Sequence, residues 1–286
     1  MKNKTYFYVP LMFFSFLIFV WFLKFNHKIR FKTHHAPLSV YFFLDNTNSK
    51  MKYTDGVVSL ETDPLESSKI SFQWEITPTE NGSYVETSLI LLQNSFYEKI
   101  KILSKKSELF DESLLYIESF RDNLVKDYQS FRWNKPVLDS LDSALCLCIN
   151  ISSKISEKAN QMNKNIDALA EQLFNQNKNP PRLYIHELDI YNQTLNFDFC
   201  FPISNTTKPL NVESPYFIKT FEKIEGNSIR FFGNYGGTYR GWFSMLANIE
   251  NLNKNLSYPF VEVFFDSPFS GSSDKEWMSK TYYMIK

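Results

Sequence analysis

One order of elements occurs twice in the second half of this chain. Residues 144–202 read as a β-rich run, an amphipathic helix and a hairpin of two strands. Residues 228–286 read as a strand, a glycine-aromatic turn, a helix and two further strands. An order that repeats within one chain indicates an internal duplication. We therefore predict one domain over residues 135–286, an α+β fold around an antiparallel sheet.

Several short phrases in this domain resemble the gyrase-inhibitor-like small-molecule-binding domain, also called the AraC effector-binding domain. They are residues 184–187 behind Pro180 and Pro181, 199–203, 237–239, 262–268 and 276–277. The resemblance implies a paired fold that captures ligands in a cleft between its two halves. It also implies binding without chemistry, because domains of this family do not usually catalyse reactions.

In that family the cleft is lined by aromatic rings, and an acidic residue on the last strand attracts cationic ligands. A ring face attracts a cation by about 0.5–2 kcal/mol. The matching segment here, residues 277–282, places Lys280 where the acid is expected. If Lys280 points inward, the ligand is uncharged or anionic. If the register shifts by one residue, Lys280 points to solvent and has no role.

We expect a small hydrophobic molecule as the ligand and no catalytic residue. The candidate ligand-binding residues are aromatic side chains of both halves together with one lysine, and any single ring can instead belong to the core. They are Tyr184, Phe199, Phe201, Tyr239, Trp242, Phe264, Trp277, Lys280 and Tyr282.

Two other functions remain open. The first is hydrolysis of strained or ester-like small molecules, as in some superfamily members, through Tyr239 or Tyr282 and an acid relocated to Glu262. The neighbours Val261 and Val263 suggest that Glu262 alternates outward, as a solvated residue or in a local ion pair. The second is a protein-interaction module that has lost its pocket and binds a protein partner, as the gyrase-inhibiting members do.

The sequence shows no motif for a metal or an organic cofactor, and we expect neither. His186 is a lone histidine without a second ligand at metal-binding spacing, so we predict a hydrogen-bonded structural role for it. Residues 1–44 contain six bases and no acid, which leaves 25 bases against 31 acids and a net charge of −6 in the rest. An acidic body without a helix-turn-helix segment ahead of the domain predicts no nucleic-acid partner.

Residues 1–35 predict a membrane anchor and a juxtamembrane segment. Residues 6–23 carry no charge and are framed by bases, and these 18 residues at about 1.5 Å each approach the roughly 30 Å core of a bilayer. The alternative is a cleaved signal peptide, whose apolar stretch is shorter and ends at an Ala-x-Ala pattern that is missing here. We therefore predict one transmembrane helix, with the lipid bilayer as the partner of residues 6–23.

The bases that flank this segment favour a cytoplasmic position for the rest of the chain. Four of them follow the segment and two precede it. Cys146, Cys148 and Cys200 are odd in number and lack CxxC spacing. We therefore expect buried, unpaired thiols and no disulfide framework, which agrees with a reducing compartment.

Residues 36–134 predict a second, smaller α+β region. Alternation over residues 69–77 and a β-rich run over 84–92 flank a turn, which predicts a hairpin, and apolar residues at helical spacing predict one long helix over 96–128. This order, with the phrase at residues 72–78, resembles the end of a helix-grip domain of the START-like or polyketide-cyclase-like type. Such domains are longer and enclose a deep cavity, so we expect a shortened region without a working cavity.

Overall fold

The computed structural model divides the chain into two compact units, which are described separately. One unit comprises residues 1–34 and 40–125, and the other comprises residues 35–39 and 126–286. The residues described are 12, 14, 15, 18, 20, 26–44, 51–62, 70–92, 96–104, 106–173, 179–203, 212–266 and 271–286.

Most of the predicted membrane segment, residues 6–23, lies outside the described residues. Within the described part of the chain, no helix has both the length and the apolar character needed to cross a membrane. Strand β1 (Asn26–Thr33) occupies the region that we predicted as a juxtamembrane segment, and it belongs to the N-terminal unit.

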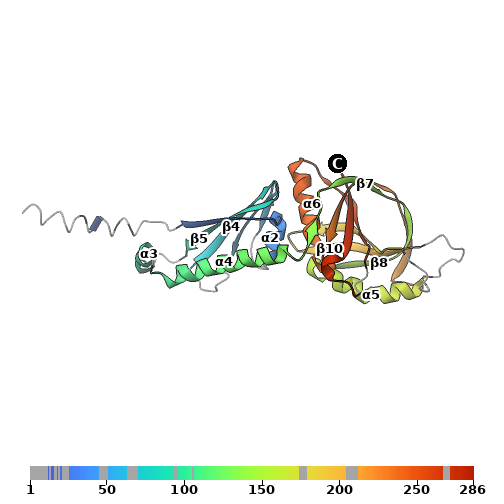
Figure 1. The fold of residues 1–286 in the computed structure, drawn as a ribbon, viewed down its shortest axis with the longest axis horizontal. Coiled ribbons are helices and arrows are strands. Elements are labelled where there is room, and N and C mark those ends of the chain that lie inside the picture. Colours follow the sequence, from blue (N-terminus) through green and yellow to red (C-terminus); the bar gives the residue numbers. More distant parts are fainter. Residues whose placement is uncertain are drawn as a thin grey trace, which may run out of the picture. The chain divides into compact units, whose positions relative to one another are not determined.

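The N-terminal unit is an antiparallel sheet of five strands with a long helix on one face (Figure 1). The sheet order is β1-β5-β4-β3-β2, so the first strand pairs with the last. The remaining elements are α2 (Pro37–Phe43), β2 (Lys52–Thr54), β3 (Val57–Thr62), β4 (Ile70–Thr79), β5 (Gly82–Leu91), α3 (Phe96–Leu103) and α4 (Glu108–Tyr128). The α+β character and the β4–β5 hairpin are confirmed, whereas the START-like resemblance stays a prediction.

Aromatic packing joins α4 to the sheet in this unit. The Phe120 ring lies 5.3 Å from the Trp74 ring and 6.4 Å from the Phe31 ring, and Tyr116 lies 5.4 Å from Phe72. Phe72 and Trp74 are at most 2% exposed, because alternate residues of β4 face the helix. Large rings therefore fill the layer between α4 and the sheet.

The predicted single helix over residues 96–128 was wrong, because two helices occupy this range. Helix α3 ends at Leu103, and α4 begins at Glu108. The hydroxyl of Ser107 accepts a hydrogen bond from the backbone N–H of Phe110 at 3.2 Å, which is typical of a residue that caps a helix start. The periodicity of the apolar residues did not reveal this break, since it continues on both sides.

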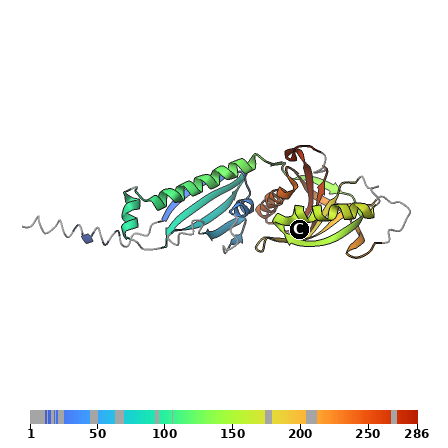
Figure 2. The ribbon, with the colours of Figure 1, turned by 90° about the horizontal axis from the view of Figure 1, so that it is seen from below.

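The C-terminal unit is a curved antiparallel sheet of nine strands with two helices (Figures 1 and 2). The first repeat is β8 (Ala144–Lys154), α5 (Lys158–Gln172), β9 (Arg182–Asp189) and β10 (Thr194–Pro202), and the second is β12 (Ile224–Phe232), α6 (Tyr239–Asn251), β13 (Leu256–Phe264) and β14 (Met278–Ile285). The short strands β6 (Arg132–Trp133), β7 (Val137–Leu141) and β11 (Tyr216–Phe221) were not predicted.

The strand order confirms the internal duplication. The sheet reads β11-β8-β10-β9-β13-β14-β12-β6, with β7 also paired to β12. From its outer strand inward, the first repeat runs β8, β10, β9, and the second runs β12, β14, β13, so equivalent strands occupy equivalent places. The repeats meet where β9 pairs with β13, between Tyr184 and Val261 among others. This junction places residues of both repeats side by side.

The two faces of this sheet have different coverings. On the helix face, Lys158 of α5 reaches Glu262 of β13, and Trp242 of α6 packs 5.5 Å from Phe260 of the same strand. The opposite face holds a core cluster that includes Cys146, Cys148, Tyr184, Cys200, Phe221, Ile224, Val261, Val263 and Tyr282. Strand β13 is therefore buried on both sides.

The expectation of unpaired cysteines was wrong for two of the three. Cys148 and Cys200 form a disulfide, with 4.1 Å between their Cα atoms, while Cys146 is a buried free thiol. The pairing follows from strand register, because Cys148 of β8 lies directly opposite Cys200 of β10. Sequence spacing could not show this, since 52 positions separate the two residues. The argument for a reducing compartment therefore loses its basis.

Candidate functional site

A pocket of about 680 Å³ lies on the helix face of the C-terminal sheet and takes its walls from both repeats. Its volume is within the roughly 300–1,000 Å³ of small-molecule sites. The first repeat contributes Ala159, Asn160, Met162, Asn163, Ile166, Asn179, Pro180, Pro181, Phe199 and Phe201. The second contributes Asn234, Tyr235, Gly236, Phe264, Phe265, Asp266 and Trp277.

The first-repeat wall follows from two periodicities. Ala159, Met162 and Ile166 stand three and four residues apart on α5, so they share one face of that helix. Phe199 and Phe201 stand two residues apart on β10, so both point to the face that α5 covers. Their rings lie 5.7 Å apart. This wall is apolar and comes from regular elements, which hold its shape.

The second-repeat wall is centred on Tyr235. Its ring lies 4.8 Å from the Phe264 ring and 5.3 Å from the Trp277 ring. The phenol oxygen accepts a hydrogen bond from the Asp266 backbone N–H at 3.0 Å and reaches the carbonyls of Asp266 and Met278 at 2.9 and 3.1 Å. Burial raises the pKa of the Tyr235 hydroxyl. The phenol is therefore a neutral anchor that fixes the strand ends around the pocket.

The pocket lining carries little charge. Among the described residues, Asp266 is the one carboxylic acid of the lining, and no lysine, arginine or histidine belongs to it. One oxygen of Asp266 accepts a hydrogen bond from the Met278 backbone N–H at 2.6 Å. The described lining therefore offers ring faces, amides of four asparagines and the exposed carboxylate of Asp266, two residues beyond the end of β13.

The structure brings four of the nine predicted ligand-binding residues into this pocket. These are Phe199, Phe201, Phe264 and Trp277. Sequence reasoning missed the α5 wall, Phe265 and Asp266, and it did not select Tyr235. The spacing of Ala159, Met162 and Ile166 was a usable signal, but the same pattern is typical of a helix that only packs on a core.

The other five predicted residues lie elsewhere in the C-terminal unit. Trp242 is fully buried between α6 and Phe260. Tyr239 lines an adjoining pocket of about 480 Å³ beside Arg240, which shares Asn234 and Gly236 with the ring-lined pocket. Tyr184 and Tyr282 belong to the core cluster on the opposite face, where the Phe221 ring stacks on Tyr184 at 3.5 Å.

Lys280 also lies on the opposite face and is only 14% exposed. Its ammonium group forms an ion pair with Asp139 of β7 and lies 4.9 Å from the centre of the Tyr282 ring. The hydrogen bond from Lys280 lowers the pKa of the Asp139 carboxyl from 3.8 to about 2. The charge of Lys280 is therefore neutralised within the fold, away from the ring-lined pocket.

The Asp139–Lys280 pair predicts a pH dependence of stability. Because folding lowers the pKa of Asp139, its contribution is present above the unfolded value and is lost as the pH falls toward about 2. We expect the free energy of unfolding of Asp139→Asn to change less than that of the wild type between about pH 4 and pH 2. Urea titrations at both pH values measure the free energy of unfolding, with Asp142→Asn, which removes an exposed acid nearby, as the control. An equal change in the free energy of unfolding between the two pH values for all three proteins would contradict the assignment.

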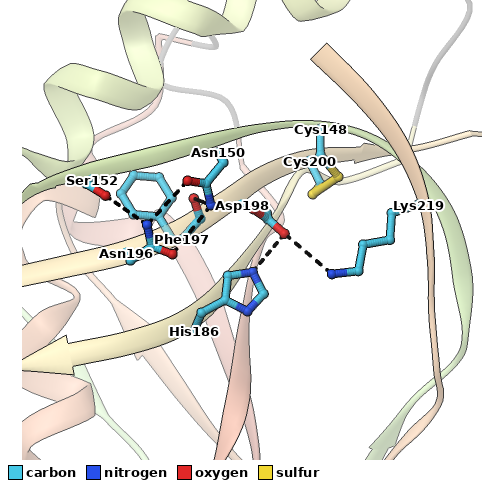
Figure 3. A network of polar contacts seen from close by, with 9 residues as sticks. All are labelled: Cys148, Asn150, Ser152, His186, Asn196, Phe197, Asp198, Cys200 and Lys219. Atoms are coloured by element: carbon cyan, nitrogen blue, oxygen red, sulfur yellow. Dashed lines mark hydrogen bonds and ion pairs between the residues drawn. A yellow bond between two sulfur atoms is a disulfide. The ribbon is translucent and has the colours of Figure 1, made fainter. Parts of the chain in front are cut away.

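A second polar network lies around Asp198 on that same face (Figure 3). The Asp198 carboxylate is 5% exposed and contacts His186 Nε2 and Asn150 Nδ2, each at 2.7 Å, and Lys219 Nζ at 3.9 Å. Burial opposes ionisation, but hydrogen bonds from His186 and Asn150 hold the pKa of Asp198 below its usual value. The predicted hydrogen-bonded role of His186 is confirmed. Among the described residues, no group of side chains could hold a metal ion.

The expectation that Glu262 alternates outward to solvent was wrong, whereas the ion pair left open for it is present, with Lys158. Glu262 is fully buried on the helix face, where its carboxylate accepts hydrogen bonds from Lys158 at 3.1 Å, Thr238 at 3.0 Å and Ser279 at 2.8 Å. Tyr282 lies on the other face of the sheet. Tyr282 and Glu262, one of the two tyrosine–acid pairs of the hydrolase hypothesis, are therefore not brought together.

Comparisons with known proteins give structural similarities only. No family model matches the sequence, and no curated protein matches it. The crystal structure of the EcmrR C-terminal domain is 14% identical, with 53% of this chain and 97% of that chain covered and a TM-score of 0.44.

Two further solved structures are similar over about the same share of the chain. The structure of SAV2435 bound to tetraphenylphosphonium is 13% identical, covers 54% of this chain and 94% of that chain, and has a TM-score of 0.37. A hydrolase from Listeria innocua is 10% identical, with 53% and 92% covered and a TM-score of 0.37. The fold of the C-terminal unit rests on its own strand order and pairing, to which these low-scoring matches add no argument.

Proposed function

We propose that the C-terminal unit binds a small, ring-bearing organic molecule in the pocket between its two repeats. The observation that carries this proposal is the pocket itself, in which six aromatic side chains from both repeats surround about 680 Å³. Concave sites with mostly apolar walls and a few polar groups are typical of ligand-binding proteins. The resemblance of the sequence to ligand-capturing domains supports the same conclusion.

The lining favours an uncharged ligand over an anion. The prediction of an uncharged or anionic ligand depended on Lys280, whose ammonium group is paired with Asp139 on the other face. Among the described residues, the lining contains no base, so an anion would lose its hydration shell there and gain no charge partner from them. The ring faces and the asparagine amides suit an uncharged aromatic molecule. At the rim, the Asp266 carboxylate can accept a hydrogen bond from a donor group of the ligand.

Trp277 provides the test of this proposal. Its indole lines the pocket, so an aromatic ligand that binds there is expected to quench its fluorescence in a saturable way. We expect a library of small aromatic compounds to contain quenchers of the wild type that lose their signal in Trp277→Phe. The other tryptophans remain in that variant as an internal control. Compounds that quench both proteins equally, or a library without any saturable quencher, would count against the pocket.

The membrane anchor stays a proposal, based on the uncharged run at residues 6–23 and its flanking bases. The positive-inside rule favours a cytoplasmic position of both units, whereas the Cys148–Cys200 disulfide is more typical of an oxidising compartment. We expect the full chain to remain in the membrane pellet after alkaline carbonate extraction, and a chain without residues 2–24 to move to the supernatant. Protease treatment of intact cells tests the side. Extraction of the full chain by carbonate would contradict the anchor. Digestion of the two units by protease added outside intact cells would contradict their cytoplasmic position.

A further inference from the structure

Lys158 stands in an unusual place for a lysine. It is the first residue of α5, and its side chain is fully buried on the helix face of the sheet. Burial lowers the pKa of the Lys158 ammonium. The positive end of the helix dipole adds a further unfavourable contribution, since cations are disfavoured at a helix N-terminus. An ammonium group persists in such a place only if the surroundings compensate strongly.

The surroundings of Lys158 have the composition of a binding site for an organic cation. The ammonium donates to the Glu262 carboxylate at 3.1 Å and to the Thr238 hydroxyl. It lies 4.5 Å from the centre of the Trp242 ring and 5.6 Å from that of Phe264. A carboxylate combined with two ring faces, all shielded from water, is an arrangement that stabilises ammonium ions. These partners come from the second repeat, whereas Lys158 comes from the first.

This cation position adjoins the ring-lined pocket. Phe264 contacts both, because its ring faces Lys158 and also lines the pocket. Ala159, which follows Lys158 in the chain, also lines the pocket. So does Tyr235, whose backbone carbonyl accepts a hydrogen bond from the Thr238 hydroxyl. The pocket and the position of the ammonium group are therefore neighbouring parts of one inter-repeat space.

We propose that the Lys158 ammonium is a built-in occupant of a cation site formed by Glu262, Thr238, Trp242 and Phe264. While Lys158 fills this site, a ligand in the neighbouring pocket cannot pair with Glu262. Lys158 thereby determines whether the pocket binds uncharged molecules or amines. This part of the inference rests on the proposed function of the pocket. The wild type selects uncharged aromatic molecules, and loss of the lysine side chain opens a site for primary amines.

Chemical rescue tests the cation site directly. Lys158→Ala removes a propylammonium group, so n-propylammonium chloride is expected to replace it. In full-length Lys158→Ala, the unfolding equilibrium constant is expected to fall about tenfold once the amine reaches ten times its dissociation constant. The wild type and Lys158→Ala/Glu262→Gln are expected to show no such response. 1-Propanol, which has the same chain length but no charge, is expected to leave all three unchanged.

The outcomes of this test are distinct even if the variant folds poorly. If Lys158→Ala is unfolded, circular dichroism follows its refolding as n-propylammonium is added, and recovered folding supports the cation site. Equal responses to the amine and to 1-propanol, or no response to either, overturn it. A purely structural role of the ion pair predicts destabilisation in Lys158→Ala without selective rescue by the amine.

Ligand class is tested with a pair of probes of similar shape, benzyl alcohol and benzylammonium. Through Trp277 fluorescence, we expect the wild type to favour benzyl alcohol. In Lys158→Ala the ratio of the two association constants is expected to shift by about tenfold toward benzylammonium. An unchanged ratio overturns the selection by Lys158. If neither probe quenches Trp277 while n-propylammonium still rescues the variant, the pocket proposal fails and the cation site stands.

Discussion

Replacement of Glu262 by leucine is expected to lower the free energy of unfolding by about 3–5 kcal/mol, because it leaves the fully buried ammonium of Lys158 without its charge partner. Lys158→Met is expected to cost a similar amount, since it strands the carboxylate. Removal of both charges in Lys158→Met/Glu262→Leu is expected to recover most of the loss, because an apolar pair of similar volume avoids the cost of burying two ions. Urea denaturation of the four proteins gives the complete double-mutant cycle.

A matched exposed pair provides the control for this cycle. Lys223 and Glu225 also form an ion pair, but their side chains are 48% and 73% exposed. Removing either of these charges is expected to change the free energy of unfolding by less than about 1 kcal/mol, because water screens exposed ion pairs. A loss of this small size in Glu262→Leu would show that the Lys158–Glu262 pair is not buried as described.

Loss of the Cys148–Cys200 disulfide is the second large effect that we expect. The bond spans 52 positions, and a chain-entropy argument gives a stabilisation on the order of 4 kcal/mol for a loop of this length. Cys148→Ala/Cys200→Ala is therefore expected to unfold at a clearly lower urea concentration than the wild type. Cys146→Ala, which removes only the buried free thiol, is the matched control and is expected to lose much less.

Thiol counting gives an independent check of the same bond. Protein purified without reductant and then denatured should react with a thiol reagent at one cysteine, and after reduction it should react at three. Three reactive thiols before reduction would contradict the disulfide. Equal stability of the double variant and Cys146→Ala would show that the bond, even if formed, does not stabilise the fold.

The hairpin of the N-terminal unit and the repeated order of elements in the C-terminal unit could be predicted because they depend on patterns within short segments. The hairpin of β4 and β5 followed from alternation around a turn at Gly82, and α5 followed from helical spacing up to Leu173. Gly82 has φ of +142°, and a Cβ atom there would lie 2.1 Å from the Thr33 carbonyl oxygen, so this turn needs glycine. The duplicated repeat order was visible for the same local reasons.

The sites were harder to predict because they depend on pairing between distant strands. Strand β13 is buried on both faces, so alternation of Val261 and Val263 with Glu262 could not tell which face the acid occupies. The partner of Lys280 lies on β7, a strand that the sequence did not reveal. Helical spacing did not single out Lys158, and only the meeting of the two repeats shows its burial against Glu262.

The most direct test of ligand capture between the repeats compares two tryptophan substitutions on α5. Asn163 lines the pocket, whereas its neighbour Lys164 is exposed and outside the lining. The dissociation constant of the strongest uncharged aromatic ligand should be measured by calorimetry in the wild type, Asn163→Trp and Lys164→Trp. We expect the bulky side chain at position 163 to weaken binding by more than about tenfold, and the one at position 164 to leave it unchanged. Equal affinities in all three proteins would contradict the proposed pocket.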